Sequence, residues 1–276
     1  MTLPMPTLDH VVVNVRDRLD AAVETYRRLG FTMTPRGTHT LGSINHLAIF
    51  GTEYLELLGA RAGDTGRPEI LGSPAGLNGL VFGTEDSAAV YATLNGAGVP
   101  VEPPLEFSRP VELAEGARDA TFRVVRLKPG VTEVGRLFFC HHFNPELVWR
   151  DEWRQHTNGV IGVSRAVIAA RDPGVLGGLF AKMFGADAVR RSAAGCSLLV
   201  GLSRFDVVTP VGLAAEFGAA AASAEGRDTF MAALTLRVRS LERAVAAVQV
   251  PGVVRDDERI LVPASEAFGV TLELRG

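Results

Sequence analysis

The chain has 276 residues, of which 47% are hydrophobic and 21% are charged, and its formal net charge is −3. These values are typical of a globular protein with room for two domains, and the absence of a basic tail argues against a nucleic-acid partner. No apolar run is long enough to span a bilayer, the N-terminus lacks a signal-peptide pattern, and there are only two cysteines. We therefore expect a cytoplasmic protein with no membrane partner.

The first sixty residues combine one amphipathic helix with several short strands. Apolar residues at Ala22, Tyr26 and Leu29 predict a helix over residues 21–29 with one buried stripe, and Gly30 is the residue type that ends helices. Short runs rich in β-branched and aromatic residues predict strands. These strands are residues 11–15, 31–34, 45–50 and 54–58. The segment is therefore a βαβββ module.

This module occurs four times along the chain. Similar β-rich runs, each followed by a helical pattern, begin near residues 77, 163 and 233. The predicted modules span about residues 6–60, 76–143, 160–210 and 230–276. A regular internal repeat decides the architecture, here an α+β protein of two paired domains, residues 1–150 and 151–276. We expect the tryptophan-containing segment 144–159 to be a packed connector, and residues 212–226 to form a loop or short helix.

Several motifs carry a family resemblance. Asp9-His10-Val11-Val12 at the start of the first module and Tyr54-Leu55-Glu56-Leu57 at its end resemble the vicinal oxygen chelate superfamily, which includes glyoxalase I, extradiol dioxygenases and bleomycin-type resistance proteins. Asn45-His46-Leu47 and Cys140-His141-His142 resemble its glyoxalase-like-domain group. The resemblance implies curved mixed sheets, and a cup whose metal ligands lie on the first and last strands of each module.

The resemblance places His10 and Glu56 at ligand positions in the first module, whereas the second module has Gly79 at the histidine position. Because side chains alternate along a strand, Cys140 and His142 share one face and His141 the other, although the choice among them depends on where the strand begins. The predicted triad is His10, Glu56 and His142. Two imidazoles and one carboxylate suit Zn, Fe(II), Mn or Ni, and a metal-free cup is the alternative.

Other polar residues are candidates for catalysis or substrate binding. His46 and Tyr54 join Glu56 as possible catalytic groups, although a strand-surface hydrogen bond is an equally good role for His46. Arg36, His39 and Cys140 are candidate substrate contacts, whereas solvated loop positions are the simpler interpretation of Arg36 and His39.

The second pair of modules has lost the metal pattern. Arg165 and Ala233 stand at the histidine positions, and Asp206 and Glu273 stand at the glutamate positions. We expect Arg165 to pair with a carboxylate, because guanidinium and carboxylate groups form strong charge-assisted hydrogen bonds. The second domain is thus predicted to be a structural partner or an anion-binding cup.

Two functions fit this pattern. The first is a metal-dependent enzyme, such as a lyase or isomerase, in which the metal acts as a Lewis acid on a small oxo- or hydroxy-compound. The second is a metal-free protein that binds or sequesters a small molecule, which the substituted ligand positions favour. Modules of this fold also pair between chains, so a homodimer is a further expectation, although the internal duplication removes the need for one.

Overall fold

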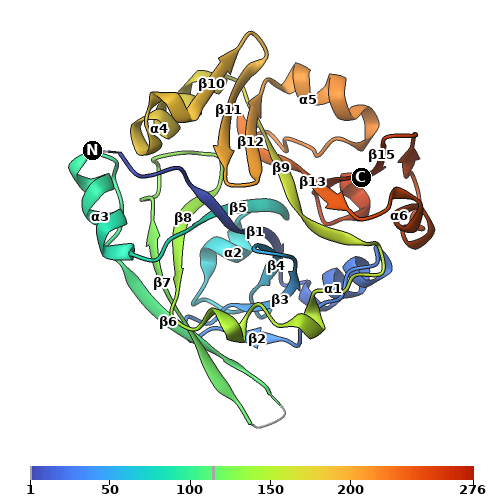
Figure 1. The fold of residues 1–276 in the computed structure, drawn as a ribbon, viewed down its shortest axis with the longest axis horizontal. Coiled ribbons are helices and arrows are strands. Elements are labelled where there is room, and N and C mark those ends of the chain that lie inside the picture. Colours follow the sequence, from blue (N-terminus) through green and yellow to red (C-terminus); the bar gives the residue numbers. More distant parts are fainter. Residues whose placement is uncertain (1, 114–115) are drawn as a thin grey trace.

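The computed structural model describes residues 2–113 and 116–276, and it consists of two eight-stranded mixed sheets flanked by helices (Figure 1). The strand orders are β2-β3-β4-β1-β5-β8-β7-β6 and β10-β11-β12-β9-β13-β16-β15-β14. In both sheets the first strand of a module runs parallel to the last strand of that module and antiparallel to the first strand of its partner module. The predicted α+β fold of paired βαβββ modules is confirmed.

The two sheets account for most of the chain. The first sheet comprises β1 (Thr7–Arg16), β2 (Gly37–Thr38), β3 (Ile44–Ile49), β4 (Tyr54–Gly59), β5 (Gly76–Gly83), β6 (Leu105–Val111), β7 (Arg118–Arg126) and β8 (Arg136–His142). The second comprises β9 (Val160–Ala170), β10 (Val189–Ser192), β11 (Gly195–Val200), β12 (Ser203–Val208), β13 (Thr229–Val238), β14 (Val254–Arg255), β15 (Arg259–Val262) and β16 (Thr271–Arg275). The α-helices are α1 (Leu19–Arg28), α2 (Pro68–Gly72), α3 (Ser87–Gly96), α4 (Pro173–Phe184), α5 (Pro210–Phe217) and α6 (Leu241–Ala247). Short 3-10 helices are η1 (Pro145–Leu147), η2 (Asp151–Trp153), η3 (Ala186–Ala188), η4 (Gly218–Ala220) and η5 (Ala264–Glu266).

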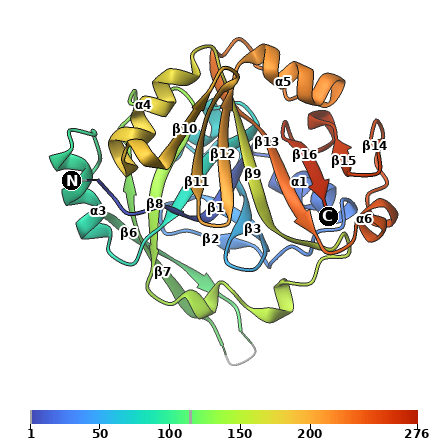
Figure 2. The ribbon, with the colours of Figure 1, turned by 45° about the horizontal axis from the view of Figure 1, so that its top comes forward.

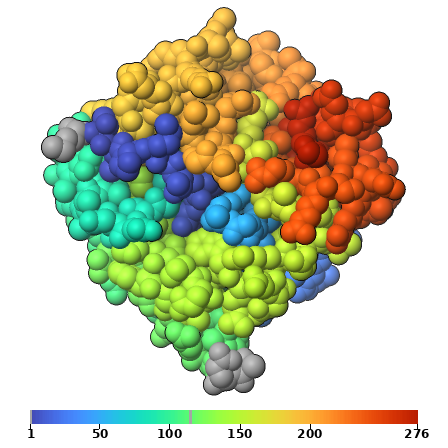
Figure 3. All heavy atoms as spheres, in the orientation of Figure 1, coloured from blue at the N-terminus to red at the C-terminus, as the bar shows by residue number. Residues whose placement is uncertain are grey.

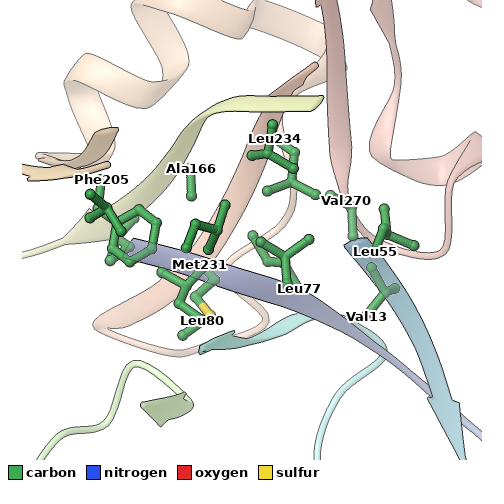
Figure 4. Close-up of a cluster of buried hydrophobic side chains, with 14 of the residues drawn as sticks. Val13, Leu55, Leu77, Leu80, Ala166, Phe205, Met231, Leu234 and Val270 are labelled. Carbon is green, nitrogen blue, oxygen red and sulfur yellow. The ribbon is translucent and has the colours of Figure 1, made fainter. Parts of the chain in front are cut away.

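The two sheets share one hydrophobic core. Figure 4 shows Val13, Leu55, Leu77 and Leu80 of the first sheet packed against Ala166, Phe205, Met231 and Leu234 of the second. Alternate residues on the same strands belong to separate clusters, one within each half of the chain. Each sheet therefore turns one face to the common core and leaves its other, concave face to form a cup.

Helices from different halves meet at the edges of this core. Figures 1 and 2 place α1 beside α6, and the Tyr26 hydroxyl of α1 donates to the carbonyl of Ala267 at 3.3 Å. The α3 and α4 regions are linked in the same way, because Lys182 donates to the carbonyl of Gly98 at 2.8 Å. These contacts extend the packing of the sheets, so the halves form one folded body.

The connector between the sheets is packed, as its tryptophans predict. Trp149 contacts the rings of Tyr54 and His142, at centroid distances of 5.6 and 4.7 Å. His156 is buried, donates from Nε2 to the carbonyl of Ile49 at 2.8 Å, and accepts from the amide of Thr32 at 3.0 Å. Figure 3 shows this yellow-green segment lying over the first half of the molecule. His156 therefore has a structural role, with both ring nitrogens engaged.

Two local predictions need correction. The helix begins at Leu19 rather than at residue 21, and residues 31–34 form no strand. Thr34 explains the second difference, because its hydroxyl accepts from the amide of Leu47 and its carbonyl accepts from the His46 ring. The amide of Thr34 still donates to the carbonyl of Leu47 at 2.8 Å, but the return bond from the Leu47 amide goes to the Thr34 hydroxyl, so no regular ladder forms. Residues 212–226 contain most of α5 and all of η4, in agreement with a short helix.

None of the helices in the described ranges, 2–113 and 116–276, combines the length and the hydropathy that a bilayer span requires.

Candidate functional site

The concave face of the first sheet encloses a cavity of about 600 Å³. The ends of the sheet approach each other there: the amide of Thr40, just beyond β2, donates to the carbonyl of Ser108 on β6 at 2.9 Å. This contact bends the sheet toward a closed barrel, with alternate side chains of its strands pointing inward. The volume of the cavity lies in the range of small-molecule binding sites.

His10 and Glu56 face each other in the wall of this cavity. The parallel pairing of β1 and β4 sets them side by side, and His10 Nε2 lies 3.8 Å from Glu56 Oε2. Tyr54 stacks on the His10 ring at a centroid distance of 4.4 Å and an interplanar angle of 9°. The structure therefore brings together the two first-module residues that the sequence predicts as ligands.

Asp9 holds the other side of the His10 ring. Its Oδ1 accepts from His10 Nδ1 at 2.5 Å and from His142 Nε2 at 3.1 Å. Burial alone would raise the pKa of Asp9, but the two neighbouring imidazoles lower it to about 2, so the carboxylate is ionised. Asp9 therefore engages Nδ1 of His10, and Nε2 is the ring nitrogen that faces Glu56.

His142 lies behind this pair rather than in the cavity wall. It packs against Trp149 and Phe122, and the only hydrogen bond of its ring to a described residue goes to Asp9. Asp9, Cys140 and His142 form a second donor cluster, with ligand atoms all within 4.8 Å of one another. His142 thus contacts the predicted metal pair through Asp9, and Cys140 belongs to both the cluster and the cavity wall.

Glu56 is buried and held by polar neighbours. Burial acts to raise its pKa. His10, His39 and a 2.6 Å hydrogen bond from Asn45 Nδ2 act to lower it, and together they outweigh burial, so the net shift is downward. His39 lines the cavity, with Nδ1 2.8 Å from Ser43 Oγ and its ring edge-on to Phe107. Burial lowers the pKa of His39 to about 4, despite the opposing effect of Glu56, so its imidazole is neutral at neutral pH.

Two predicted site residues lie away from the cavity. His46 faces the shared core side of β3, where its Nδ1 bonds the carbonyl of Thr34 at 2.7 Å. Because Glu56 pairs with Leu47 across the β3–β4 ladder, alternation directs the neighbouring His46 to the opposite face. Arg36 forms an exposed ion pair with Asp20. Neither residue is in a position to touch a ligand in the cavity.

Cys140 lines the cavity but is no nucleophile in this state. Burial raises its pKa well above the ordinary value, and the nearby Asp9 and Glu56 carboxylates add to that shift. A thiol with a raised pKa stays protonated and unreactive at neutral pH. Its place in the wall fits the predicted substrate contact.

Four further residues complete the site: Asp9, Asn45, Arg109 and Arg136. Asp9 and Asn45 stand in the motifs that carry the family resemblance, but their role depends on neighbours that only the fold supplies. Arg136 shares an alternating face with Phe138 and Cys140, and Arg109 shares one with Phe107 and Val111. That alternation was the available signal for both arginines.

The structure also explains why the second module has Gly79, rather than a histidine, at the ligand position. A side chain at Gly79 would place its Cβ only 2.9 Å from Cβ of Val12 on the adjacent strand. Real side chains almost never approach so closely, so a histidine does not fit there without a shift of β1. The first cup therefore takes its imidazole from one module alone.

The second cup is filled instead of open. Leu213 and Phe217 of α5 pack into its concave face. Arg165 pairs with Asp206 at 2.5 Å and with Glu216 of α5 at 3.0 Å, and Thr235 donates to Glu273 at 2.6 Å. The predicted pairing of Arg165 with a carboxylate is present, and these side chains satisfy one another.

The sequence comparison matches residues 8–184 to the glyoxalase-like domain family. This chain belongs to that family. The match includes all of the first sheet except Thr7, and it includes the His10–Glu56 site, whereas most of the second sheet lies outside it. A search of curated protein sequences found no match.

Solved structures share the fold over nearly the full length of this glyoxalase-like protein. A hypothetical protein from Staphylococcus aureus has a TM-score of 0.67 at 11% identity, covering 98% of this chain and 99% of the other. A mutant of 4-hydroxymandelate synthase from Streptomyces coelicolor has a TM-score of 0.56 at 14% identity, covering 99% and 94%. A xylose isomerase-like TIM barrel/4-hydroxyphenylpyruvate dioxygenase fusion protein has a TM-score of 0.61 at 14% identity, covering 100% of this chain and 50% of the other. At these identities the likeness shows a shared fold and no more.

Proposed function

We propose that the protein is a metal-dependent enzyme, of the lyase or isomerase type, that acts on a small oxo- or hydroxy-compound in the first cup. The observation that carries the proposal is the His10–Glu56 pair, 3.8 Å apart in the wall of a cavity of about 600 Å³. A nitrogen and a carboxylate oxygen this far apart can bind one cation, because each ligand bond is about 2.1 Å long.

The surrounding residues fit a metal centre. Asp9 bonds the far nitrogen of His10, which is the carboxylate–histidine arrangement that orients metal-binding imidazoles. His10 and Glu56 would hold a divalent cation such as Zn, Fe(II), Mn or Ni. A bound cation would supply Lewis-acid chemistry, stabilising negative charge on a substrate oxygen. The cluster of Asp9, Cys140 and His142 is the competing location for a cation.

The chain's own groups supply orientation and proton transfer. Tyr54 stacks on His10 and fixes the plane of its ring. His39 lines the cavity and is neutral at neutral pH because burial lowers its pKa to about 4, so in this proposal its imidazole, although a weak base, is free to accept a proton from the substrate in place of His46. Its ring is held by Ser43 and Phe107, which limits it to one orientation.

The aromatic wall of the cavity favours a second candidate, a metal-free binding protein. Phe107 and Phe122 stack at a centroid distance of 5.3 Å, and both line the cavity together with Phe138. Flat apolar molecules pack well against such surfaces. In this alternative His10 and Glu56 would contact the ligand directly.

Metal content of protein purified without a histidine tag separates the two functions. We expect near-stoichiometric metal by mass spectrometry in the wild type and in His46→Ala, and its loss in His10→Ala and Glu56→Ala. Metal retained in Glu56→Ala but lost in His142→Ala would move the ion to the Asp9 cluster. Absence of metal from the wild type, even after reconstitution, would contradict the enzyme proposal and favour the binding protein.

A further inference from the structure

An unpartnered guanidinium lies in the wall of the first cavity. Arg109 on β6 lines the cavity and is only 4% exposed. Its Nη2 is buried and has no hydrogen-bond partner, and its guanidinium forms no ion pair with any residue in the ranges 2–113 and 116–276. A buried charge normally has a partner, because its removal from water is costly.

Two other arginines of the wall are already paired with carboxylates. Arg67 lies 2.5 Å from Glu69, and Arg126 lies 3.1 Å from Glu102. Arg136, by contrast, has no ion pair with a described residue, although it reaches the same cavity as Arg109. The cavity therefore contains donors that nothing in the described chain satisfies.

Glu56 does not serve as the missing partner. It influences Arg109 through space, but its Oε1 accepts from Asn45 at 2.6 Å and its Oε2 faces His10 at 3.8 Å. Burial lowers the pKa of Arg109, with Tyr54 and Glu56 opposing the shift. The nearby carboxylate is thus committed to the His10 side of the cavity.

We propose that Arg109 binds the carboxylate of the substrate, which makes the substrate a small organic acid. This deepens the function proposed above and rests on it. A guanidinium presents a planar set of donors that matches a carboxylate, and the charge-assisted bonds it forms are short and strong. Arg136 adds a second positive charge to the same cavity.

The walls beside Arg109 indicate what the rest of the substrate is like. Phe107 lies on the same face of β6 as Arg109, and stacks with Phe122 of β7. His39 packs edge-on against Phe107 at 5.3 Å. An acid with a planar or apolar body would place its carboxylate at Arg109 and its body against these rings.

The test uses two probes of nearly the same shape, 3-phenylpropionate and the uncharged 3-phenylpropanamide. Calorimetry on metal-stripped wild-type protein should show the acid binding at least about tenfold more tightly than the amide. Arg109→Gln should remove this preference, and Arg136→Gln should reduce it by a smaller factor. Arg123→Gln is the matched control, because Arg123 pairs with Glu106 and is not part of the cavity wall.

Thermal unfolding without a probe checks that the variants are folded. Arg109→Gln should be at least as stable as the wild type, because the substitution removes an unpaired buried charge. Equal binding of acid and amide by the wild type, no binding of the acid, or an acid preference that survives in Arg109→Gln would each overturn the proposal. Inorganic phosphate binding more tightly than the acid would likewise overturn the assignment to a carboxylate.

Metal content measured on the same preparations before stripping keeps the two proposals separate. An acid preference in a protein that takes up no metal would contradict the metal-dependent function but support the role of Arg109. Metal uptake without an acid preference would overturn the role of Arg109 alone.

Discussion

The two halves of the chain repeat one module and build sheets of the same strand order, yet their concave faces have opposite contents. The first cup encloses a cavity whose wall includes a buried Glu56, a paired His10 and an unpartnered Arg109. In the second cup α5 packs against the sheet, and Arg165 is neutralised by two carboxylates. The duplicated fold thus has one open concave face and one that is filled by a helix. The identity of the inward side chains decides which concave face is open and which is filled.

The largest expected effect follows from the packing of the second cup. Phe217→Ala removes a ring that is 3% exposed in the cluster formed by α5. We expect the free energy of unfolding to fall by about 3–5 kcal/mol, as for other buried Phe→Ala substitutions. Denaturant titration measures this change, and Val211→Ala on the exposed side of the same helix should alter stability by less than about 0.5 kcal/mol. Equal effects of the two substitutions would show that the second cup is not packed.

The arginine positions test the comparison directly. Arg165→Met leaves Glu216 without this ion pair and Asp206 with Arg204 alone, so we expect a loss of about 2 kcal/mol in unfolding free energy. Arg204→Met removes a half-exposed partner of Asp206 and should cost less than about 1 kcal/mol. Arg109→Gln in the first cup should show no loss at all. A comparable loss at Arg109 would contradict the distinction between the two cups.

The Asp9 carboxylate offers a test on the first cup alone. Asp9→Asn keeps the shape of the side chain but weakens its hold on His10 Nδ1. Because such partners orient metal ligands, we expect metal affinity to fall by about 10- to 100-fold. Competition with a chelator measures the affinity. Asp86→Asn, an exposed helix cap that asparagine replaces well, serves as the control.

The smallest expected effect is a pH dependence of the stability that Glu216 contributes in the second cup. Burial acts to raise the pKa of Glu216, but the effect of Arg165 is larger and opposite. The folded-state pKa therefore lies below the ordinary 4.5. The stabilisation by this carboxylate is therefore complete above pH 4.5 and is lost as the pH falls through the lowered pKa. We expect Glu216→Gln to cost less than about 1 kcal/mol near neutral pH, because solvent screens the pair.

Unfolding measured from pH 7 to about pH 3 should show this cost shrinking as the wild type protonates. Glu24→Gln, on the exposed surface of α1, should show a much smaller pH dependence. A cost for Glu216→Gln that grows in acid would contradict the sign of the shift.

Much of the fold could be predicted from local patterns. The helix stripe of Ala22, Tyr26 and Leu29 is buried, and the repeat fixed the number and order of modules. Residues 31–34 were predicted wrongly because the Leu47 amide donates to the Thr34 hydroxyl, and the Thr34 carbonyl, which would accept that bond in a strand, accepts from the His46 ring. Side-chain competition of this kind depends on β3, which lies beyond the local window.

The site was predictable where its residues lie within one module. His10 and Glu56 could be paired because the first and last strands of a module are adjacent, and alternation then determines which residues share their face. His46 was misplaced because its face depends on the register between β3 and β4, in which Leu47 stands opposite Glu56. His142 was predicted as the third ligand of this pair, and the structure places it in the neighbouring group of Asp9, Cys140 and His142, where it bonds Asp9.

The sequence by itself determined the repeated module, the family and the His10–Glu56 pair, since periodicity and motif spacing are local properties of the chain. Only the tertiary structure decided that one cup is open and the other is filled, because that outcome depends on contacts between residues far apart in the chain. The contact of Thr40 with Ser108, which closes the first sheet around its cavity, and that of Arg165 with Glu216, which ties α5 to the second sheet, are of this kind.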